Sequence, residues 1–287
     1  MTRSGTVRAN AQELYFEVHG EGPPLVLVMG IGYDATLWTL AQVPALSRTF
    51  QVVIFDNRDA GRSSNATGAY TIADMADDTA GLMDALEIER AHVLGLSMGG
   101  MIALEVALRH AGRVDRLVLS GCGAAPARAA FDPIRTWSWV KAADTTGDVF
   151  ACQQFTWLFS HAFLRDAEAV QRTIAVLAGN PNPVRAEAYR RQADAYLQYD
   201  ALDRLAAITS PTLVVVGEQD LLTPPWVCRE VANGIPGAQF EIITGDGASH
   251  VVPLERPDEF NRLVTRFLGP VAQGRRGAGL SGDHRLS

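Results

Sequence analysis

The sequence has few cysteines, no long apolar run and no concentrated positive charge. Cys122, Cys152 and Cys228 are odd in number and widely spaced, so they predict neither a disulfide framework nor a zinc site. We expect reduced thiols, as in a cytoplasmic protein. The longest apolar runs are strand-sized, such as 25–29, and too short for a membrane span. Residues 1–20 hold no apolar core behind a basic patch, so no secretory signal is expected.

Basic residues are also in the minority, with 25 lysines and arginines against 32 acidic residues and a net charge of -7. Binding to nucleic acid needs a concentrated basic face, so that class of partner is disfavoured. The composition, with 47% hydrophobic and 20% charged residues over 287 positions, is that of a globular protein with a large core. We expect a small-molecule substrate and no membrane partner, while the sequence leaves monomer and homodimer equally open.

Short apolar runs alternate with helical patterns over most of the chain. Two extended segments, 7–9 and 14–19, flank a turn and predict a hairpin. Six further runs read as buried strands and five segments as helices, which predicts a doubly wound, mostly parallel eight-stranded α/β sheet covered on both faces. The predicted strands are 25–29, 51–55, 91–96, 115–120, 212–217 and 239–243, and the predicted helices are 35–46, 72–86, 98–110, 225–232 and 256–268.

The alternation stops between residues 124 and 205, where only helical patterns and loops occur. We interpret 124–205 as a helical cap, or lid, inserted into a core formed by 1–123 and 206–270. The Gly-rich segment 271–287 has no periodicity, which predicts a disordered tail.

The motif Gly95-Leu-Ser97-Met-Gly99 follows a predicted strand and precedes a predicted helix. This is the context of a nucleophile elbow, a turn so sharp that the residues two before and two after the serine must be small. The helix N-terminus beneath Ser97 favours negative charge beside its hydroxyl. A coincidental tight turn is the weaker interpretation.

A serine hydroxyl needs a base and an orienting acid to become a nucleophile. Asp220 leaves the end of the strand 212–217, and His250 lies in a loop before the last helix. With Ser97 they make a catalytic triad in the order Ser, Asp, His. Glu218 and Asp246 are rival acids, but Glu218 is close to the strand and Asp246 lies in a glycine-flanked turn. For His250, a helix-capping role is the weaker alternative.

An oxyanion needs backbone donors about 3 Å from the developing charge. The amide of Met98, directly after the nucleophile, is one candidate. The loop 29–33 should supply the second, which we assign to the amide of Ile31, because Gly30 and Gly32 on either side permit an unusual backbone path.

The same loop also matches a dinucleotide-binding pattern. Gly30-Ile-Gly32-Tyr-Asp-Ala35 follows a strand, and Asp56 lies where a ribose-binding acid would belong. Two points disfavour this reading: the strand is the third in the chain, and the triad would be left without a purpose. We expect no cofactor and no metal, and we interpret 56–64 as a turn whose charges pair locally.

These motifs resemble those of α/β-hydrolase fold enzymes over residues 7–270. The matching segments are 25–32, 55–63, 95–101, 216–220 and 247–250. Gly-Leu-Ser-Met-Gly-Gly and Leu-Leu-Thr-Pro-Pro are similar to 3-oxoadipate enol-lactonases and related esterases, and the Met-Gly loop resembles aclacinomycin methylesterase and its relatives.

The chain departs from that family pattern at two places. Many members have His-Gly where this chain has Met29-Gly30, which removes a polar group and leaves Met29 to line the pocket. Many have Arg-Gly-x-Gly where this chain has Arg58-Asp-Ala-Gly61, a change that we expect to affect only a turn.

Phe155, Phe159 and Phe163 recur every four residues, which predicts one aromatic stripe on a helix. Packing of the cap against the core is the favoured interpretation of this stripe. The alternative is that some rings roof an apolar pocket, together with Trp137 or Trp157. Candidate pocket residues are therefore Met29, Gly30, Trp137, Trp157 and Phe159. For His161 two interpretations are open: it contacts substrate, or it faces solvent.

No arginine pair is aimed at the site, which favours an uncharged hydrophobic substrate, although Arg135, Arg165 or Arg185 could serve a carboxylate. We predict a serine hydrolase that cleaves a carboxylic ester or lactone through an acyl-enzyme on Ser97. The alternatives are a carbon–carbon bond hydrolase or a perhydrolase with the same triad, or a ligand-binding receptor with an idle triad. A dinucleotide-binding oxidoreductase is the most remote.

Overall fold

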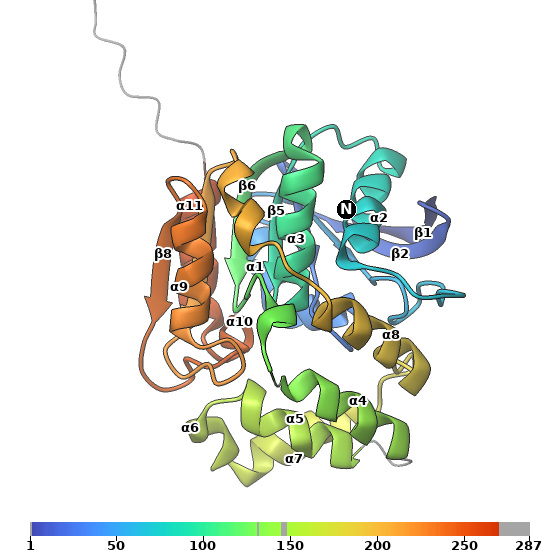
Figure 1. The fold of residues 1–287 in the computed structure, drawn as a ribbon, viewed down its shortest axis with the longest axis vertical. Coiled ribbons are helices and arrows are strands. Elements are labelled where there is room, and N and C mark those ends of the chain that lie inside the picture. The colour runs from blue at the N-terminus through green and yellow to red at the C-terminus, as the bar shows by residue number, and fades with distance from the viewer. Residues whose placement is uncertain (1, 131, 145–147, 270–287) are drawn as a thin grey trace, which may run out of the picture.

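The computed structural model describes residues 2–130, 132–144 and 148–269, so the tail predicted at 271–287 lies outside the described residues. Its eight strands are β1 (Arg3–Ala9), β2 (Gln12–His19), β3 (Pro24–Val28), β4 (Gln51–Phe55), β5 (Ala91–Leu96), β6 (Val114–Ser120), β7 (Thr212–Gly217) and β8 (Gln239–Ile243). They form one sheet in the order β1-β2-β4-β3-β5-β6-β7-β8 (Figure 1). The pairs β1·β2 and β2·β4 are antiparallel and the rest are parallel. The predicted doubly wound, mostly parallel sheet is confirmed.

The first two strands form the predicted hairpin. Asn10 and Ala11 at its turn have φ values of 42° and 63°. Positive φ at both central residues is the geometry that matches the right-handed twist of the flanking strands.

Helices cover both faces of the sheet. One face packs against α2 (Ile72–Ala85), α3 (Met98–Arg109) and α9 (Pro225–Gly234), and the short η2 (Ala111–Arg113) follows α3. The other face packs against η1 (Ala35–Leu40), α1 (Gln42–Leu46) and α11 (Pro257–Leu268), with α10 (Val252–Glu255) directly before α11. The central strands β3, β4, β5 and β7 are buried over almost their whole length because helices cover both of their faces, whereas β1, β2 and β8 are partly exposed.

The helix predicted over 35–46 is two helices, with a break at Ala41 (φ -146°). Pro44 has no amide hydrogen to donate to the carbonyl of Leu40, so a continuous helix would lose a bond there. Asp34 begins the first piece by accepting a hydrogen bond from the amide of Thr36.

A helical segment separates β6 from β7, as predicted. It consists of η3 (Pro126–Arg128), α4 (Pro133–Ala143), α5 (Asp148–Leu158), α6 (His161–Leu164), α7 (Ala167–Ala178), α8 (Ala186–Leu197) and η4 (Leu202–Ala207). In Figure 1, α4 to α7 gather at one end of the molecule, apart from the helices that flank the sheet. The amide of Ala201 donates to the carbonyl of Ala124 at 2.8 Å, so the segment leaves and re-enters the core at one place. That 124–205 acts as a lid stays a prediction. Within the described ranges, none of the helices has the length and apolar character needed to cross a membrane.

Candidate active site

Ser97 lies at the corner between β5 and α3, with φ 57° and ψ -123°. A Cβ added to Gly95 would lie 2.1 Å from the carbonyl oxygen of Gly99, and one added to Gly99 would lie 2.1 Å from that of Val28. Neither position can therefore carry a side chain. The backbone strain that this turn stores is typical of functional sites.

Asp220 and His250 meet at the same end of the sheet. Nδ1 of His250 lies 2.9 Å from Oδ2 of Asp220, and both side chains are buried. Oδ1 of Asp220 accepts from the amides of Leu222 and Thr223, so the carboxylate is held in place from behind. This geometry fixes the orientation of the imidazole ring.

Thr223 is a member of this cluster that the sequence reading missed. Its hydroxyl donates to Oδ2 of Asp220 at 2.9 Å and lies 3.1 Å from Nδ1 of His250. The signal was present in the spacing, since a Thr three residues after an Asp at a strand end is typical of a side-chain-capped turn.

The rival acids lie elsewhere. Glu218 accepts a hydrogen bond from the amide of Gly245 at 3.0 Å, and Asp246 is exposed. Of the three candidate carboxylates, Asp220 alone bonds to His250 among the described residues.

Both amides proposed for the oxyanion are free of protein acceptors. Within the described ranges, neither the Ile31 nor the Met98 N–H donates a hydrogen bond. A Cβ added to Gly30 would lie 3.2 Å from Cβ of Ser97, so the glycine brings the loop backbone close to the nucleophile. The arrangement leaves two donors available beside the serine.

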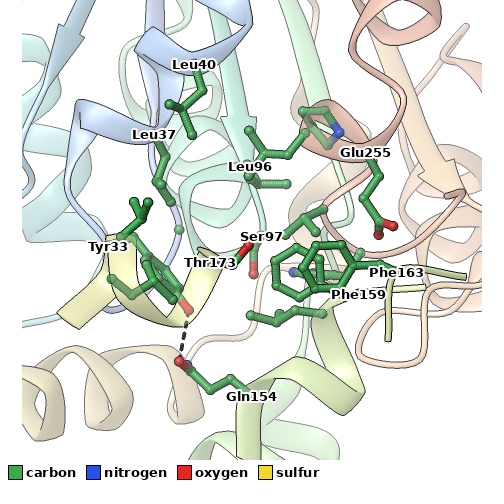
Figure 2. A pocket seen from close by; sticks show the side chains of 18 of the residues that line it. Tyr33, Leu37, Leu40, Leu96, Ser97, Gln154, Phe159, Phe163, Thr173 and Glu255 are labelled. Carbon is green, nitrogen blue, oxygen red and sulfur yellow. Dashed lines mark hydrogen bonds between the residues drawn. The ribbon is translucent and has the colours of Figure 1, made fainter. Parts of the chain in front are cut away.

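Ser97 and His250 open onto one cavity of about 520 Å³. Of the predicted pocket residues, Met29, Gly30, Trp137 and Phe159 line it. Trp157 does not and instead packs, half-buried, against the core. Other apolar side chains dominate the wall (Figure 2): Ile31, Leu37, Trp38, Leu40, Leu96, Leu158, Phe163, Val176, Leu177, Leu222, Val251 and Leu254.

The family model described as "alpha/beta hydrolase fold" matches residues 23–257. The chain belongs to the α/β hydrolase fold family. The chain is 34% identical over 283 residues to a Caulobacter sp. (strain K31) protein named "Putative carbamate hydrolase RutD", covering 94% of this chain and 99% of the relative. It is 28% identical over 257 residues to 3-oxoadipate enol-lactonase 1 of Acinetobacter baylyi, covering 87% and 90%.

A solved α/β hydrolase structure is similar over nearly its whole length. The enol-lactonase from Burkholderia xenovorans LB400 superposes with a TM-score of 0.82 and 30% identity, covering 92% of this chain and 99% of that one. The predicted likeness to enol-lactonases and esterases is confirmed, and the comparisons support the prediction that the chain is an enzyme of the hydrolase class.

In this α/β hydrolase Phe155 lies on α5, Phe163 lies on α6 and Phe159 lies in the bend between them, so the prediction of one helix is wrong. Helix α5 ends at Leu158, and Ser160 begins α6 by accepting a hydrogen bond from the amide of Phe163. The three rings still gather: Phe159 and Phe163 stack with centroids 4.1 Å apart and line the cavity, while Phe155 is buried beneath them. His161 is exposed and lies outside the cavity wall.

The arginines that could have served a substrate carboxylate lie away from the cavity. Arg135, Arg165 and Arg185 are exposed and do not line it. Arg172 does line it, but its guanidinium bonds to Glu168 one turn earlier on α7. The sequence reading missed Arg172, because helix periodicity alone does not say which face meets the cavity.

The cavity wall also carries a neutral polar pair. The hydroxyl of Tyr33 donates to Oε1 of Gln154 at 2.9 Å (Figure 2). Burial raises the pKa of Tyr33, so its phenol stays protonated and neutral. This pair adds hydrogen-bonding capacity without adding charge.

Asp56, the candidate ribose ligand, is engaged inside the protein. Its carboxylate accepts from the amide of Ala35 at 2.9 Å and from Nε of Arg62 at 2.8 Å. The expectation of local pairing holds for this ion pair only. Arg58 bonds to Asp78 of α2, and Asp59 bonds to Arg191 of α8. Because Arg58 and Asp59 are buried, they need partners that other elements supply.

Among the described residues, no group of three or more His, Cys, Asp or Glu side chains is arranged to hold a metal ion.

Proposed function

We propose that the protein is a serine hydrolase that cleaves a carboxylic ester or lactone bond of an uncharged, hydrophobic small molecule. The observation that carries this proposal is that Ser97, on its strained turn, and His250, bonded to Asp220, open onto one apolar cavity. Nucleophile, base and orienting acid are the three roles that acyl transfer to serine requires.

The reaction follows from these positions. Oγ of Ser97 attacks the carbonyl carbon while His250 takes its proton, and the amides of Ile31 and Met98 stabilise the oxyanion. His250 then gives that proton to the leaving alkoxide, which departs as an alcohol or as the opened end of a lactone. Water attacks the acyl-enzyme while His250 takes its proton, the bond from the acyl carbon to Oγ of Ser97 breaks, and His250 returns the proton to Oγ as the acid product leaves. Asp220 keeps the imidazole oriented throughout.

The substrate class is argued from the cavity. A volume of about 520 Å³ and walls of Leu, Phe and Trp side chains suit a drug-sized apolar molecule. Arg172, the arginine among the described lining residues, is engaged with Glu168, so a substrate carboxylate would find no unpaired guanidinium. The enol-lactonase relatives support an ester or lactone bond. Other relatives are named carbamate hydrolases, a name that also indicates attack on a carbonyl carbon.

The helical segment 124–205 serves in this proposal as a cap that sets specificity. Trp137 of α4, Gln154 of α5, Phe163 of α6 and Thr173 of α7 all line the cavity, whereas Ser97 and His250 come from the core. In this proposal the reacting side chains come from the core, and the cap adds its own part of the wall to the one that the core supplies.

Labelling with a fluorophosphonate and a hydrolysis screen over acyl esters, aryl esters and lactones test the proposal. Ser97→Ala is expected to abolish the adduct and to lower turnover by about 10³–10⁶-fold. Ser210→Ala is the matched control, because its buried hydroxyl has no partner among the residues that the structure describes and lies outside the cavity. Turnover that survives in Ser97→Ala would overturn the proposal. An adduct on Ser97 without turnover of any ester or lactone would favour the receptor or carbon–carbon hydrolase alternatives.

A further inference from the structure

Gln192 of α8 joins two loops beside the proposed active site. Its side chain is fully buried, with 0% exposure. Oε1 accepts a hydrogen bond from the amide of Gly32 at 2.9 Å, and Nε2 donates to the carbonyl of Arg58 at 3.0 Å. Both ends of the amide are therefore engaged, one on the loop 29–33, which we call the oxyanion loop, and one on the turn after β4.

The oxyanion loop is held from a second side as well. Nδ2 of Asn57 donates to the carbonyl of Met29 at 3.0 Å. On the α8 side, a Cβ added to Gly32 would lie 2.6 Å from the ring of Tyr189, so helix and loop are in direct contact. Gly32 has a φ of 78°, a backbone conformation that it adopts without strain. The loop thus lies clamped between Asn57 and α8.

That clamp bears on the amide of Ile31. The peptide unit that carries this N–H joins Gly30 to Ile31, so glycine loosens it on one side only, and within the described ranges the N–H has no protein acceptor. A donor stabilises an oxyanion only when it is held about 2.7–3.1 Å from the developing charge. Asn57 holds the peptide unit before this one through the carbonyl of Met29, and Gln192 holds the unit after it through the amide of Gly32.

We propose that Gln192 is a positioning residue for the oxyanion hole: it holds Gly32 so that the neighbouring Ile31 amide faces the carbonyl attacked by Ser97. This inference rests on the proposed ester or lactone hydrolysis. It also means that α8, within the segment predicted to set specificity, supports the chemical step. Local pattern carries no sign of this role, because Gln192 stands in the polar run Arg-Arg-Gln-Ala-Asp.

The test compares Gln192→Met with Arg191→Met. Met has a similar length but accepts no strong hydrogen bond, so the Gly32 amide loses its partner. Arg191 is the matched control because it ties the same helix to the turn after β4 through Asp59 and leaves the oxyanion loop untouched. For Gln192→Met we expect kcat to fall by about 10–100-fold with KM nearly unchanged. The reason is that the Ile31 amide, once displaced, no longer stabilises the oxyanion, which forms only in the transition state. Arg191→Met should lower the melting temperature and keep kcat.

Two more readouts separate positioning from stability. A boronic acid that mimics the tetrahedral intermediate should bind Gln192→Met more weakly by the same factor as kcat. Gln192→Glu keeps an oxygen for the Gly32 amide, so it should retain more of kcat than Gln192→Met. Equal kcat in Gln192→Met and Arg191→Met, or a loss confined to melting temperature, would overturn the inference.

The rate of fluorophosphonate labelling distinguishes this failure from failure of the proposed function. Attack of Ser97 on phosphorus uses the same oxyanion donors and needs no known substrate. Slower labelling of folded Gln192→Met supports the inference, and labelling at the wild-type rate overturns it. Loss of the proposed function would instead show as a wild-type protein that is labelled on Ser97 but hydrolyses no ester or lactone.

Discussion

Ser160 and Glu255 lie 95 residues apart and are joined by two hydrogen bonds. The amide of Ser160 donates to Oε2 of Glu255 at 2.9 Å and its hydroxyl donates to Oε1 at 2.6 Å. Glu255 also accepts a hydrogen bond from the hydroxyl of Ser249, the residue before His250. One carboxylate therefore connects the break between α5 and α6, where the stacked Phe159 ring lies, to the segment that carries the proposed base.

Glu255→Gln should destabilise the protein, because the charged acceptor of three hydrogen bonds becomes a neutral amide, and its NH₂ group can meet a serine hydroxyl only if that hydroxyl stops donating. Hydrogen bonds to a charged group contribute about 1.5–3 kcal/mol each and neutral ones about 0.5–1.5 kcal/mol, so urea denaturation should show a lower midpoint. Glu259→Gln is the control, since that carboxylate forms an ion pair with Arg256 at the surface and exposed pairs contribute about 0–1 kcal/mol. Equal midpoints for the two variants would contradict the structural role of Glu255.

Asp220→Asn should lower kcat by about 10⁴-fold while leaving the fold intact. The amide nitrogen of Asn would meet Nδ1 of His250 and favour the wrong tautomer, so the base could not accept the serine proton. Steady-state kinetics on any ester found by the screen measures the loss. Asp246→Asn, an exposed acid in the next loop, should keep full activity. The orienting role of Asp220 would be refuted by a variant that retains a tenth of wild-type kcat.

His92 should make the protein less stable as the pH falls. Its ring is 8% exposed beside Phe50, and burial lowers its pKa below the usual 6.5, partly opposed by Asp115 and reinforced by Arg116. The unfolded chain therefore binds a proton that the folded chain resists. The stabilisation is complete above about pH 6.5 and is lost towards the lowered folded-state pKa, at no more than about 1.4 kcal/mol per pH unit.

Urea denaturation between pH 5 and 8 measures this slope, and His92→Gln should flatten it. The difference between wild type and variant isolates His92 from the other histidines. An identical slope in the two proteins would show that His92 does not contribute.

Local physics made the sheet and the elbow predictable. Apolar, β-branched runs of five to seven residues suit buried parallel strands, and the sharp turn at Ser97 needs glycines whose contacts lie within a few residues or on the adjacent strand. Helix ends were less predictable where a single residue changes the outcome. Pro44 removes one hydrogen-bond donor from the backbone, and Ser160 begins a new helix. The apolar spacing over 35–46 and the phenylalanine spacing over 155–163 nevertheless continue past these two residues.

By itself the sequence determined the order of strands and helices, the strained serine, and the types of side chain that follow each strand, because these depend on neighbours along the chain. Only the tertiary structure decided which distant groups meet. The bond from Gly32 to Gln192 spans 160 residues, Glu255 reaches Ser160 across 95, and Trp157 faces the core while Gln154 meets the cavity. Such contacts depend on how helices from separate segments pack, and a pattern read over one helix carries no information about the face that its partner covers.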